Sequence, residues 1–343
     1  MERRCARKSR IGRVKDSLRV GRITLCLFLW VQVSCGDSKT NSNSGPVNQQ
    51  PELAAARARF HTKIVADMAQ SGPASPSPPS IFKTVHYNAP VGPCVAYLTP
   101  DPGDGKKHPA VLWAHGGYGG IDSYFWVDQP TTNDQSARAF RQAGLILMIP
   151  SWRGENDNPG KFEMFYGEVD DLLAARNYLV GLPYVDPSRI YLAGHSTGGT
   201  ITLLAAESGS GFRAAFSLGG VADLKKRLAA GKTQTNPPFD LTNDQEYTLR
   251  SAIFHLGSLQ SPTFYFEGEG EYTARQAAQM AIVARAQDAP LQVFIIPGGD
   301  HFSIILPITR LIASKVLADN GPACNIEFTP EEVQTAFRTL ARK

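Results

Sequence analysis

Short apolar runs alternate with longer amphipathic segments along most of this chain. Runs rich in Val, Ile, Leu and Phe are typical of buried strands, and apolar positions three or four apart are typical of helices. We expect strands at 82–88, 94–99, 110–114, 145–149, 189–193, 214–218, 263–266 and 293–296, and helices at 132–143, 167–180, 200–207, 272–286 and 304–317. The pattern therefore predicts an α/β fold with a mostly parallel sheet covered by helices on both faces.

Other segments flank or interrupt this alternation, which extends over 81–320. Residues 51–70 have helical spacing and predict one helix, and the Pro/Ser-rich residues 71–80 predict a linker. Residues 221–258 separate two expected strands by a mixed polar stretch, which forms either a small cap over the strand ends or a plain long connection. The tail, 321–343, is expected to be helical and to carry no chemistry.

The stretch Gly194-His-Ser-Thr-Gly-Gly199 lies between an expected strand and an expected helix. A G-x-S-x-G motif in this context predicts a nucleophile elbow, a turn so sharp that side chains two positions from the serine would collide. Glycines at 194 and 198 remove those side chains. Ser196 is therefore the candidate nucleophile, placed at a helix N-terminus whose free N–H groups can face developing negative charge.

A serine needs a base to lose its proton at neutral pH, and the chain offers seven histidines. Only His301 lies in a loop directly after the last expected strand, in Pro297-Gly-Gly-Asp-His301. This position also agrees with the chain order serine, acid, histidine found with nucleophile elbows. We therefore expect His301 to be the base.

The acid that orients this histidine is expected in the loop after the strand at 263–266. Three glutamates crowd that loop, Glu267, Glu269 and Glu271, and no aspartate is present there. Glu271 lies farthest beyond the strand end, just before a helix that would hold its backbone, so it is the preferred candidate, with the other two as alternatives. Asp300 is too close in sequence to His301 to reach its ring well.

An oxyanion site requires two N–H donors beside the nucleophile. Thr197, directly after Ser196, is expected to supply one. The second is expected from the loop His115-Gly-Gly-Tyr-Gly-Gly120, where Gly117 or Tyr118 would donate. A dinucleotide site is a poor alternative for this loop, because it lacks the G-x-G-x-x-G spacing.

Together these motifs resemble the catalytic domain of the prolyl oligopeptidase family, a branch of the α/β-hydrolases with dienelactone hydrolase-like esterases as close relatives. The resemblance rests on His115-Gly-Gly, Ser151–Glu155 with Asn158–Gly160, Asp170-Asp171, Tyr184–Ile190, Gly194–Gly199 and Gly298–His301. It covers about residues 81–320 and implies an α/β-hydrolase fold, with Ser196, His301 and Glu271 in the triad positions.

Two departures from the family pattern bear on specificity. The family has an aspartate where this chain has glutamates, and prolyl oligopeptidases carry an N-terminal β-propeller. Fewer than about 50 residues lie between the expected tether and this domain, too few for a propeller. Peptidase and esterase activity therefore both stay open.

The total charge of +4 is misleading, because it is concentrated at one end. Residues 1–22 hold nine Lys or Arg and two Asp or Glu, a local charge of +7, so the remaining residues carry −3 of the total +4. A nucleic-acid-binding domain would be basic, and this domain is not.

The N-terminal residues, 1–35, have the features of an export signal. A basic segment precedes the apolar run 23–33, which is too short to span a bilayer as a mature helix. Ser34-Cys35 followed by small polar residues resembles a bacterial lipoprotein cleavage site, although Gln32 departs from it. We expect an exported protein, periplasmic or on the outer surface, with membrane contact only through a lipid on Cys35 and a tether over 36–50.

In an exported chain, Cys94 and Cys324 would form either a disulfide or two separate buried thiols. Arg153 and Glu155 follow an expected strand end and would either bind substrate or hold the loop by ion pairing, and we favour the loop.

The sequence predicts a serine hydrolase that cleaves a small ester or a short peptide through an acyl-enzyme. We see no metal-ligating cluster and no cofactor motif in it. A different class of function is a catalytically inactive α/β-hydrolase that serves as a binding protein, which the intact serine, histidine and glycine motifs disfavour.

Overall fold

A computed structural model describes residues 52–341 apart from 69, 70, 210 and 234. The expected export signal, Cys35 and the tether over 36–50 lie outside the described residues. Within the part that is described, no helix is long and apolar enough to cross a membrane.

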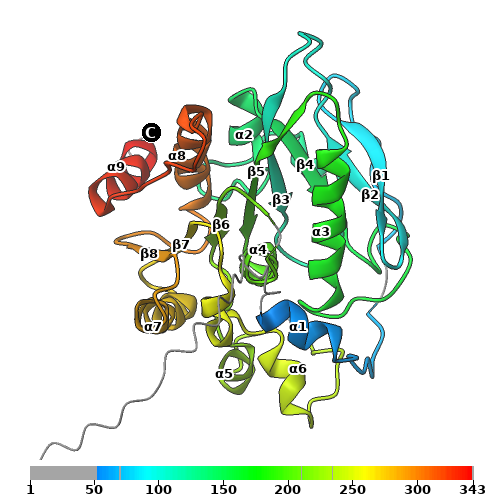
Figure 1. The fold of residues 1–343 in the computed structure, drawn as a ribbon, viewed down its shortest axis with the longest axis vertical. Coiled ribbons are helices and arrows are strands. Elements are labelled where there is room, and N and C mark those ends of the chain that lie inside the picture. Colours follow the sequence, from blue (N-terminus) through cyan, green and yellow to red (C-terminus); the bar gives the residue numbers. More distant parts are fainter. Residues whose placement is uncertain (1–51, 69–70, 210, 234, 342–343) are drawn as a thin grey trace, which may run out of the picture. The chain divides into compact units, whose positions relative to one another are not determined.

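One eight-stranded sheet forms the centre of the domain (Figure 1). Its strand order is β1-β2-β4-β3-β5-β6-β7-β8, and β2 alone runs antiparallel to its neighbours. The strands are β1 (Lys83–Ala89), β2 (Gly92–Leu98), β3 (His108–Ala114), β4 (Ile146–Pro150), β5 (Val185–His195), β6 (Ala215–Leu218), β7 (Thr263–Gly268) and β8 (Leu291–Ile296). This arrangement confirms the predicted α/β-hydrolase fold, with every expected strand present.

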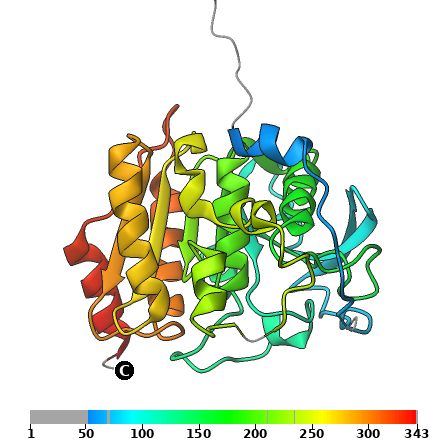
Figure 2. The same cartoon turned by 90° about the horizontal axis from the view of Figure 1, so that it is seen from below.

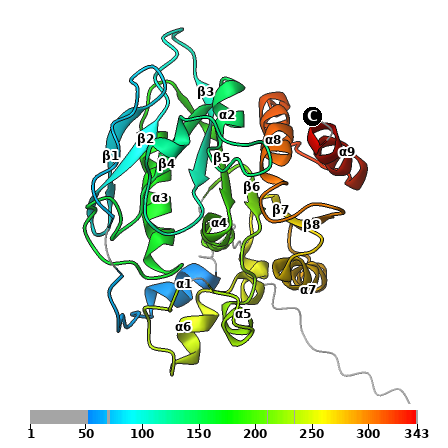
Figure 3. The ribbon, with the colours of Figure 1, turned by 180° about the vertical axis from the view of Figure 1, so that it is seen from behind.

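Helices cover both faces of the sheet, as the alternating pattern predicts. One face carries α1 (Glu52–Ala58), α3 (Gly167–Val180), α4 (Thr197–Glu207) and α7 (Tyr272–Ala286), whose buried side chains share one apolar cluster with the sheet (Figure 2). The other face carries α2 (Arg138–Gln142), α8 (Ile305–Ala318) and α9 (Pro330–Ala341) over a second cluster rich in aromatic rings (Figure 3). The sheet thus separates two cores.

Two predicted helices differ from the structure. The segment 51–70 is not one helix: α1 ends at Ala58, and an extended stretch follows in which Ile64 pairs with Phe239. The helix expected over 132–143 shrinks to α2, because Asp134 instead accepts hydrogen bonds from the backbone and hydroxyl of Ser136 and so shapes a turn. By contrast, α3 and α7 have the predicted bounds.

The interval 221–258 folds into short helices: α5 (Leu224–Ala229), α6 (Asp244–Thr248), η2 (Ala252–Phe254) and η3 (Leu256–Ser258). Hydrogen bonds fix it to α7, since Tyr272 Oη donates to the Lys226 carbonyl at 3.1 Å and Gln276 Nε2 donates to the Asp223 carbonyl at 2.9 Å. The remaining element, η1 (Ser123–Phe125), follows the loop after β3.

Cys94 and Cys324 are both free thiols in the structure. Cys94 is buried on β2 and Cys324 is partly buried after α8. They therefore form no disulfide with each other, which was one of the two alternatives.

Parallel strands end at one edge of the sheet, and the loops after them carry the candidate site. Ser196 follows β5, the glycine loop follows β3, and His301 follows β8. Because β5 is a central strand next to β3, the serine and the glycine loop are neighbours although they are far apart in sequence.

Candidate active site

Ser196 occupies the sharp turn between β5 and α4. Its backbone has φ +57° and ψ −114°, a conformation that is strained for a residue with a side chain. The Ser196 N–H donates to the Leu218 carbonyl at 2.8 Å, which ties the turn to β6. The side chain is half-buried and faces a cavity of about 560 Å³. This strained, anchored turn matches the predicted nucleophile elbow.

The glycines around the serine are required by close packing. A Cβ at Gly194 would lie 2.5 Å from the Gly198 carbonyl oxygen and 2.6 Å from Thr202 Oγ1. A Cβ at Gly198 would collide with the backbone of Ala114 at the end of β3. The elbow can form only with glycine at both positions, as the sequence predicts.

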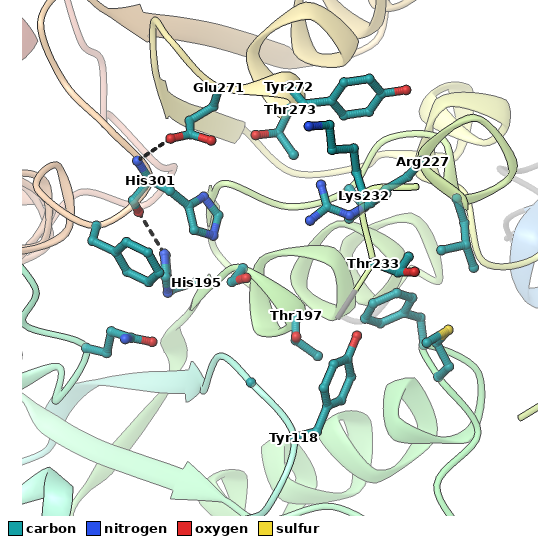
Figure 4. A pocket seen from close by; sticks show the side chains of 18 of the residues that line it. Tyr118, His195, Thr197, Arg227, Lys232, Thr233, Glu271, Tyr272, Thr273 and His301 are labelled. Carbon is teal, nitrogen blue, oxygen red and sulfur yellow. Dashed lines mark hydrogen bonds between the residues drawn. The ribbon is translucent and has the colours of Figure 1, made fainter. Parts of the chain in front are cut away.

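The acid against the histidine ring is Glu267, and the prediction of Glu271 is wrong. His301 Nδ1 lies 3.1 Å from Glu267 Oε2, and the Glu267 side chain is fully buried. Glu271 instead accepts a 3.4 Å hydrogen bond from the backbone N–H of His301 (Figure 4). The third alternative, Glu269, is exposed.

The reason is the length of β7. The sequence pattern placed the strand end at Phe266, but β7 continues through Gly268, where Gly268 pairs with Ile296 of β8. Glu267 is therefore the last side chain held by the strand itself, beside the loop that carries His301. Rigid strand ends position such groups more accurately than loops do.

The Glu267 carboxylate is held by donors other than the histidine. Gly268 N–H donates to Glu267 Oε1 at 2.8 Å, and the hydroxyl of Thr273 donates to Oε2. Because a carboxylate only accepts, the His301 ring must carry its proton on Nδ1 when it is neutral. Its Nε2 is then the free, basic nitrogen. The sequence analysis did not identify Thr273 as a residue of the site. Its position at the start of the helix that follows β7 is the feature that could have indicated it.

Gly219 packs directly against this acid–histidine pair. Its backbone has φ +69°, and a Cβ there would lie 2.6 Å from His301 Nδ1 and 3.0 Å from Glu267 Oε2. Any side chain at this position would therefore displace the pair.

We expect Gly219→Ala to lower kcat about 100-fold, because a displacement of about 1 Å in catalytic groups costs that much. Gly144→Ala is the matched control, since Gly144 has φ +79° and open space around its Cβ position. Both variants should lose about 1 kcal/mol of stability from backbone strain. Equal activities in the two variants, measured with one substrate, would contradict this role of Gly219.

His195 joins the elbow to the loop of the candidate base. Its fully buried ring donates from Nε2 to the His301 carbonyl at 2.9 Å (Figure 4) and packs 4.6 Å from the His301 ring, centroid to centroid. Burial, assisted by the neighbouring His301, lowers the pKa of His195 to about 3. His195 therefore stays neutral and acts as a fixed backbone support.

This low pKa predicts a loss of stability in acid. In the unfolded chain a histidine gains its proton below about pH 6.5, whereas folded His195 stays neutral down to about pH 3. Stability from this group is thus complete above pH 6.5 and is lost as the pH falls through that window. Between pH 7 and pH 5, urea unfolding should show the wild type losing about 2 kcal/mol more than His195→Gln. His86 is exposed, so the control variant His86→Gln should lose as much stability between these pH values as the wild type does. If the stability of His195→Gln fell with pH in parallel with that of the wild type, the low pKa of His195 would be contradicted.

The glycine loop after β3 faces the serine across the cavity. Gly117, Tyr118 and Thr197 line the cavity with Ser196, so the predicted oxyanion donors are all assembled at one place. Thr197 is the first residue of α4, where backbone N–H groups lack partners within the helix. Gly117 has φ +77°, a backbone conformation that glycine adopts without strain. Which of Gly117 and Tyr118 donates stays a prediction.

A buried contact between a glutamate and a histidine holds this loop in place. Glu155 Oε1 accepts from the Gly119 N–H at 3.0 Å, and Glu155 Oε2 lies 3.3 Å from His115 Nε2. Burial alone would lower the pKa of His115, but the Glu155 carboxylate outweighs it and the pKa is raised. The ring of Trp152 stacks on His115 at 5.4 Å. Glu155 therefore supports the glycine loop from behind.

Arg153 also has a structural position, as expected from the sequence. Its guanidinium donates two hydrogen bonds to Asp171 of α3, at 2.9 and 2.7 Å, its backbone N–H donates a third at 3.0 Å, and it forms an ion pair with Glu163 at 2.8 Å. Neither Arg153 nor Glu155 lines the cavity. The two residues that follow β4 thus hold different loops and do not pair with each other.

One wall of the cavity is a strained segment before α3. Met164 (φ +51°) and Phe165 (φ +68°) both line the cavity. The fully buried Arg250 donates to the carbonyl oxygens of Glu163 and Met164 at 3.0 and 2.9 Å, and it is neutralised by Glu246 at 2.5 Å. The interval 221–258 therefore fixes this wall from outside.

The same interval supplies a second wall of the cavity. Val221 and Leu224 give it apolar surface, and Arg227, Lys232 and Thr233 give it polar groups. Residues 221–258 are thus part of the candidate site. The position of this interval between two strands suggested that it could lie over the strand ends, but the sequence analysis did not identify these side chains.

Comparison with known proteins relates this geometry to a family. The sequence model of the prolyl oligopeptidase family matches residues 131–310. Dipeptidyl-peptidase 5 of Porphyromonas gingivalis is 25% identical over 233 residues, which cover 63% of this chain and 33% of that protein. The chain thus spans about a third of the length of this curated relative.

Solved structures share the fold at low identity. A puromycin-hydrolyzing peptidase of Mycobacterium tuberculosis aligns with a TM-score of 0.58 and 21% identity, covering 72% of this chain and 41% of that one. An esterase of Pyrobaculum calidifontis aligns with a TM-score of 0.53 and 18% identity, covering 69% and 85% respectively. The family match spans more than half of the 343 residues and includes Ser196, Glu267 and His301. The chain therefore belongs to the prolyl oligopeptidase family.

Proposed function

We propose that this protein is a serine hydrolase that cleaves short peptides through an acyl-enzyme on Ser196. The observation that carries the proposal is the contact of His301 Nδ1 with the buried Glu267 carboxylate, beside the strained serine turn. This contact leaves His301 Nε2 free to accept the serine proton.

The chemistry then follows from the groups around the cavity. Ser196 Oγ attacks the scissile carbonyl carbon while His301 takes its proton. The N–H groups of Thr197 and of Gly117 or Tyr118 stabilise the negative oxygen of the tetrahedral intermediate. His301 then donates the proton to the leaving amine, and a water molecule repeats the sequence to release the acyl group as an acid.

Both the family and the size of the cavity support a short peptide as substrate. The relatives are named as peptidases, among them a dipeptidyl-peptidase. A cavity of about 560 Å³ is in the range that holds a small ligand, so it suits a few residues of an extended peptide and not a folded protein.

Carboxylester hydrolysis is the second candidate function. The esterase of Pyrobaculum calidifontis is covered over 85% of its length, whereas the Mycobacterium tuberculosis peptidase is covered over 41%. The region shared with the esterase is thus nearly its whole chain. The same serine, histidine and oxyanion donors would serve an ester, whose leaving alcohol needs less protonation than an amine.

A panel of aminoacyl-anilides and p-nitrophenyl esters, run beside labelling with a fluorophosphonate, tests the proposal. We expect Ser196 to be labelled and dipeptidyl or N-acylaminoacyl anilides to be hydrolysed. If only the esters were hydrolysed, the peptidase function would be contradicted and the carboxylesterase function supported. A protein that is neither labelled nor active on the panel would contradict both functions and favour a binding protein.

A further inference from the structure

Three cationic side chains line the cavity without an acidic partner. They are Arg227 of α5, Lys232 just after it, and Arg275 of α7, and none forms an ion pair with a described residue. Their neighbours on α5 behave differently, because Lys225 pairs with Asp244 at 2.6 Å and Lys226 pairs with Asp223 at 3.2 Å.

The end of α5 brings two of these cations together. Gly231 (φ +64°) ends the helix, its N–H donates to the Leu228 carbonyl at 2.9 Å, and the Lys232 N–H donates to the Arg227 carbonyl at 3.1 Å. This pair of hydrogen bonds is a Schellman motif. It turns the chain back so that Lys232 returns beside Arg227, and Figure 4 shows both side chains reaching into the cavity.

The cavity offers these cations little internal compensation. Glu271 carries the only carboxylate among the described residues that line it, and that carboxylate already accepts from the His301 backbone. The positive field is local, since the chain beyond residue 22 carries a net charge of −3. Positively charged side chains that gather in a concave, partly apolar site attract an anion.

The position of the cations selects the acyl side of the substrate. His301 must pass its proton to the leaving group, so the leaving group departs on the His301 side of the serine. Figure 4 shows Arg227 and Lys232 across the cavity from His301, next to Tyr272 and Thr273 and apart from Thr197 and Tyr118. A group bound there belongs to the acyl part of the substrate.

We propose that Arg227 and Lys232 form a subsite for a carboxylate on the acyl part of the substrate, in a cavity that Arg275 also lines. The preferred substrate is then a peptide with Glu or Asp directly before the scissile bond, or the corresponding ester of a dicarboxylic acid. This inference rests on the proposed acyl-enzyme at Ser196. It further specifies that the acyl group transferred to the serine carries a negative charge.

The test measures protection of Ser196 from a fluorophosphonate by two acyl-side product analogues. N-acetyl-glutamate and N-acetyl-glutamine differ only by a carboxylate in place of an amide. We expect the glutamate derivative to protect at concentrations about 10- to 100-fold lower, as for a hydrogen-bonded charge pair. This advantage should shrink at high salt.

Variants assign the preference to the two residues. Arg227→Gln and Lys232→Gln should each reduce the ratio of the two protecting concentrations about tenfold, and the double charge reversal to Glu should invert it. Lys225→Gln removes the same charge from the same helix outside the cavity and should leave both the ratio and the labelling rate at wild-type values.

The outcomes separate the two proposals. No labelling of Ser196 would overturn the proposed function itself. Labelling with equal protection by the two analogues, or an equal effect of Lys225→Gln, would overturn the carboxylate subsite and leave the acyl-enzyme in place.

Discussion

Ser196→Ala is expected to lower kcat by about 10⁴- to 10⁶-fold and to abolish labelling by a fluorophosphonate. No neighbouring hydroxyl can take over, because only the serine is held up at the turn between β5 and α4 with φ +57°. The residual activity should come from the oxyanion donors and substrate binding, which Ala leaves in place. Titration with the fluorophosphonate and steady-state kinetics on one anilide measure both effects.

Ser208→Ala is the matched control for this variant. Ser208 lies at the opposite end of α4, where its hydroxyl donates to the Leu204 carbonyl at 2.8 Å. Its loss should leave labelling stoichiometric and kcat unchanged. Labelling of a serine other than Ser196, or a Ser196→Ala variant that keeps a tenth of the activity, would contradict the assignment of the nucleophile.

Glu267→Gln should lower kcat by about 10²- to 10⁴-fold with little change in KM. The amide is nearly the same size as the carboxylate, but it cannot stabilise the imidazolium that forms when His301 accepts the serine proton. It can also favour the wrong tautomer by presenting its NH₂ group to Nδ1. Because Glu267 is fully buried and also accepts from Gly268 and Thr273, the melting temperature should be measured with the kinetics.

Glu271→Gln distinguishes the two glutamates. Among the described residues, the Glu271 carboxylate accepts one hydrogen bond, from the backbone N–H of His301, and a glutamine can accept the same bond. This variant should therefore stay within about tenfold of the wild type. A large loss in Glu271→Gln with a near-normal Glu267→Gln would restore the sequence-based choice of the acid.

Short stretches of the sequence were sufficient to predict the backbone conformation at the nucleophile elbow and the bounds of the long helices. The glycines at 194 and 198 predict the elbow because the turn between strand and helix excludes a Cβ by hard contact, and the structure shows those contacts. The bounds of α3 and α7 were predictable for a similar reason, since a long periodic segment leaves few alternatives.

Contacts between distant segments were not predictable in this way. The pairing of Glu155 with His115, and of Arg153 with Asp171, depends on how loops after different strands fold against each other. The helix expected over 51–70 failed for the same reason: Ile64 gains strand pairing with Phe239, a partner more than 170 residues away in the chain.

The sequence by itself determined the fold class, the nucleophile elbow and the loop that carries His301, because each follows from short-range sterics and from the order of strands and helices. Only the tertiary structure decided which glutamate faces the histidine ring. That choice depended on two further residues of β7 pairing with β8, which fixed Glu267 beside His301 and left Glu271 to the backbone. Strand ends are set by pairing across the sheet, and a single chain segment does not contain that information.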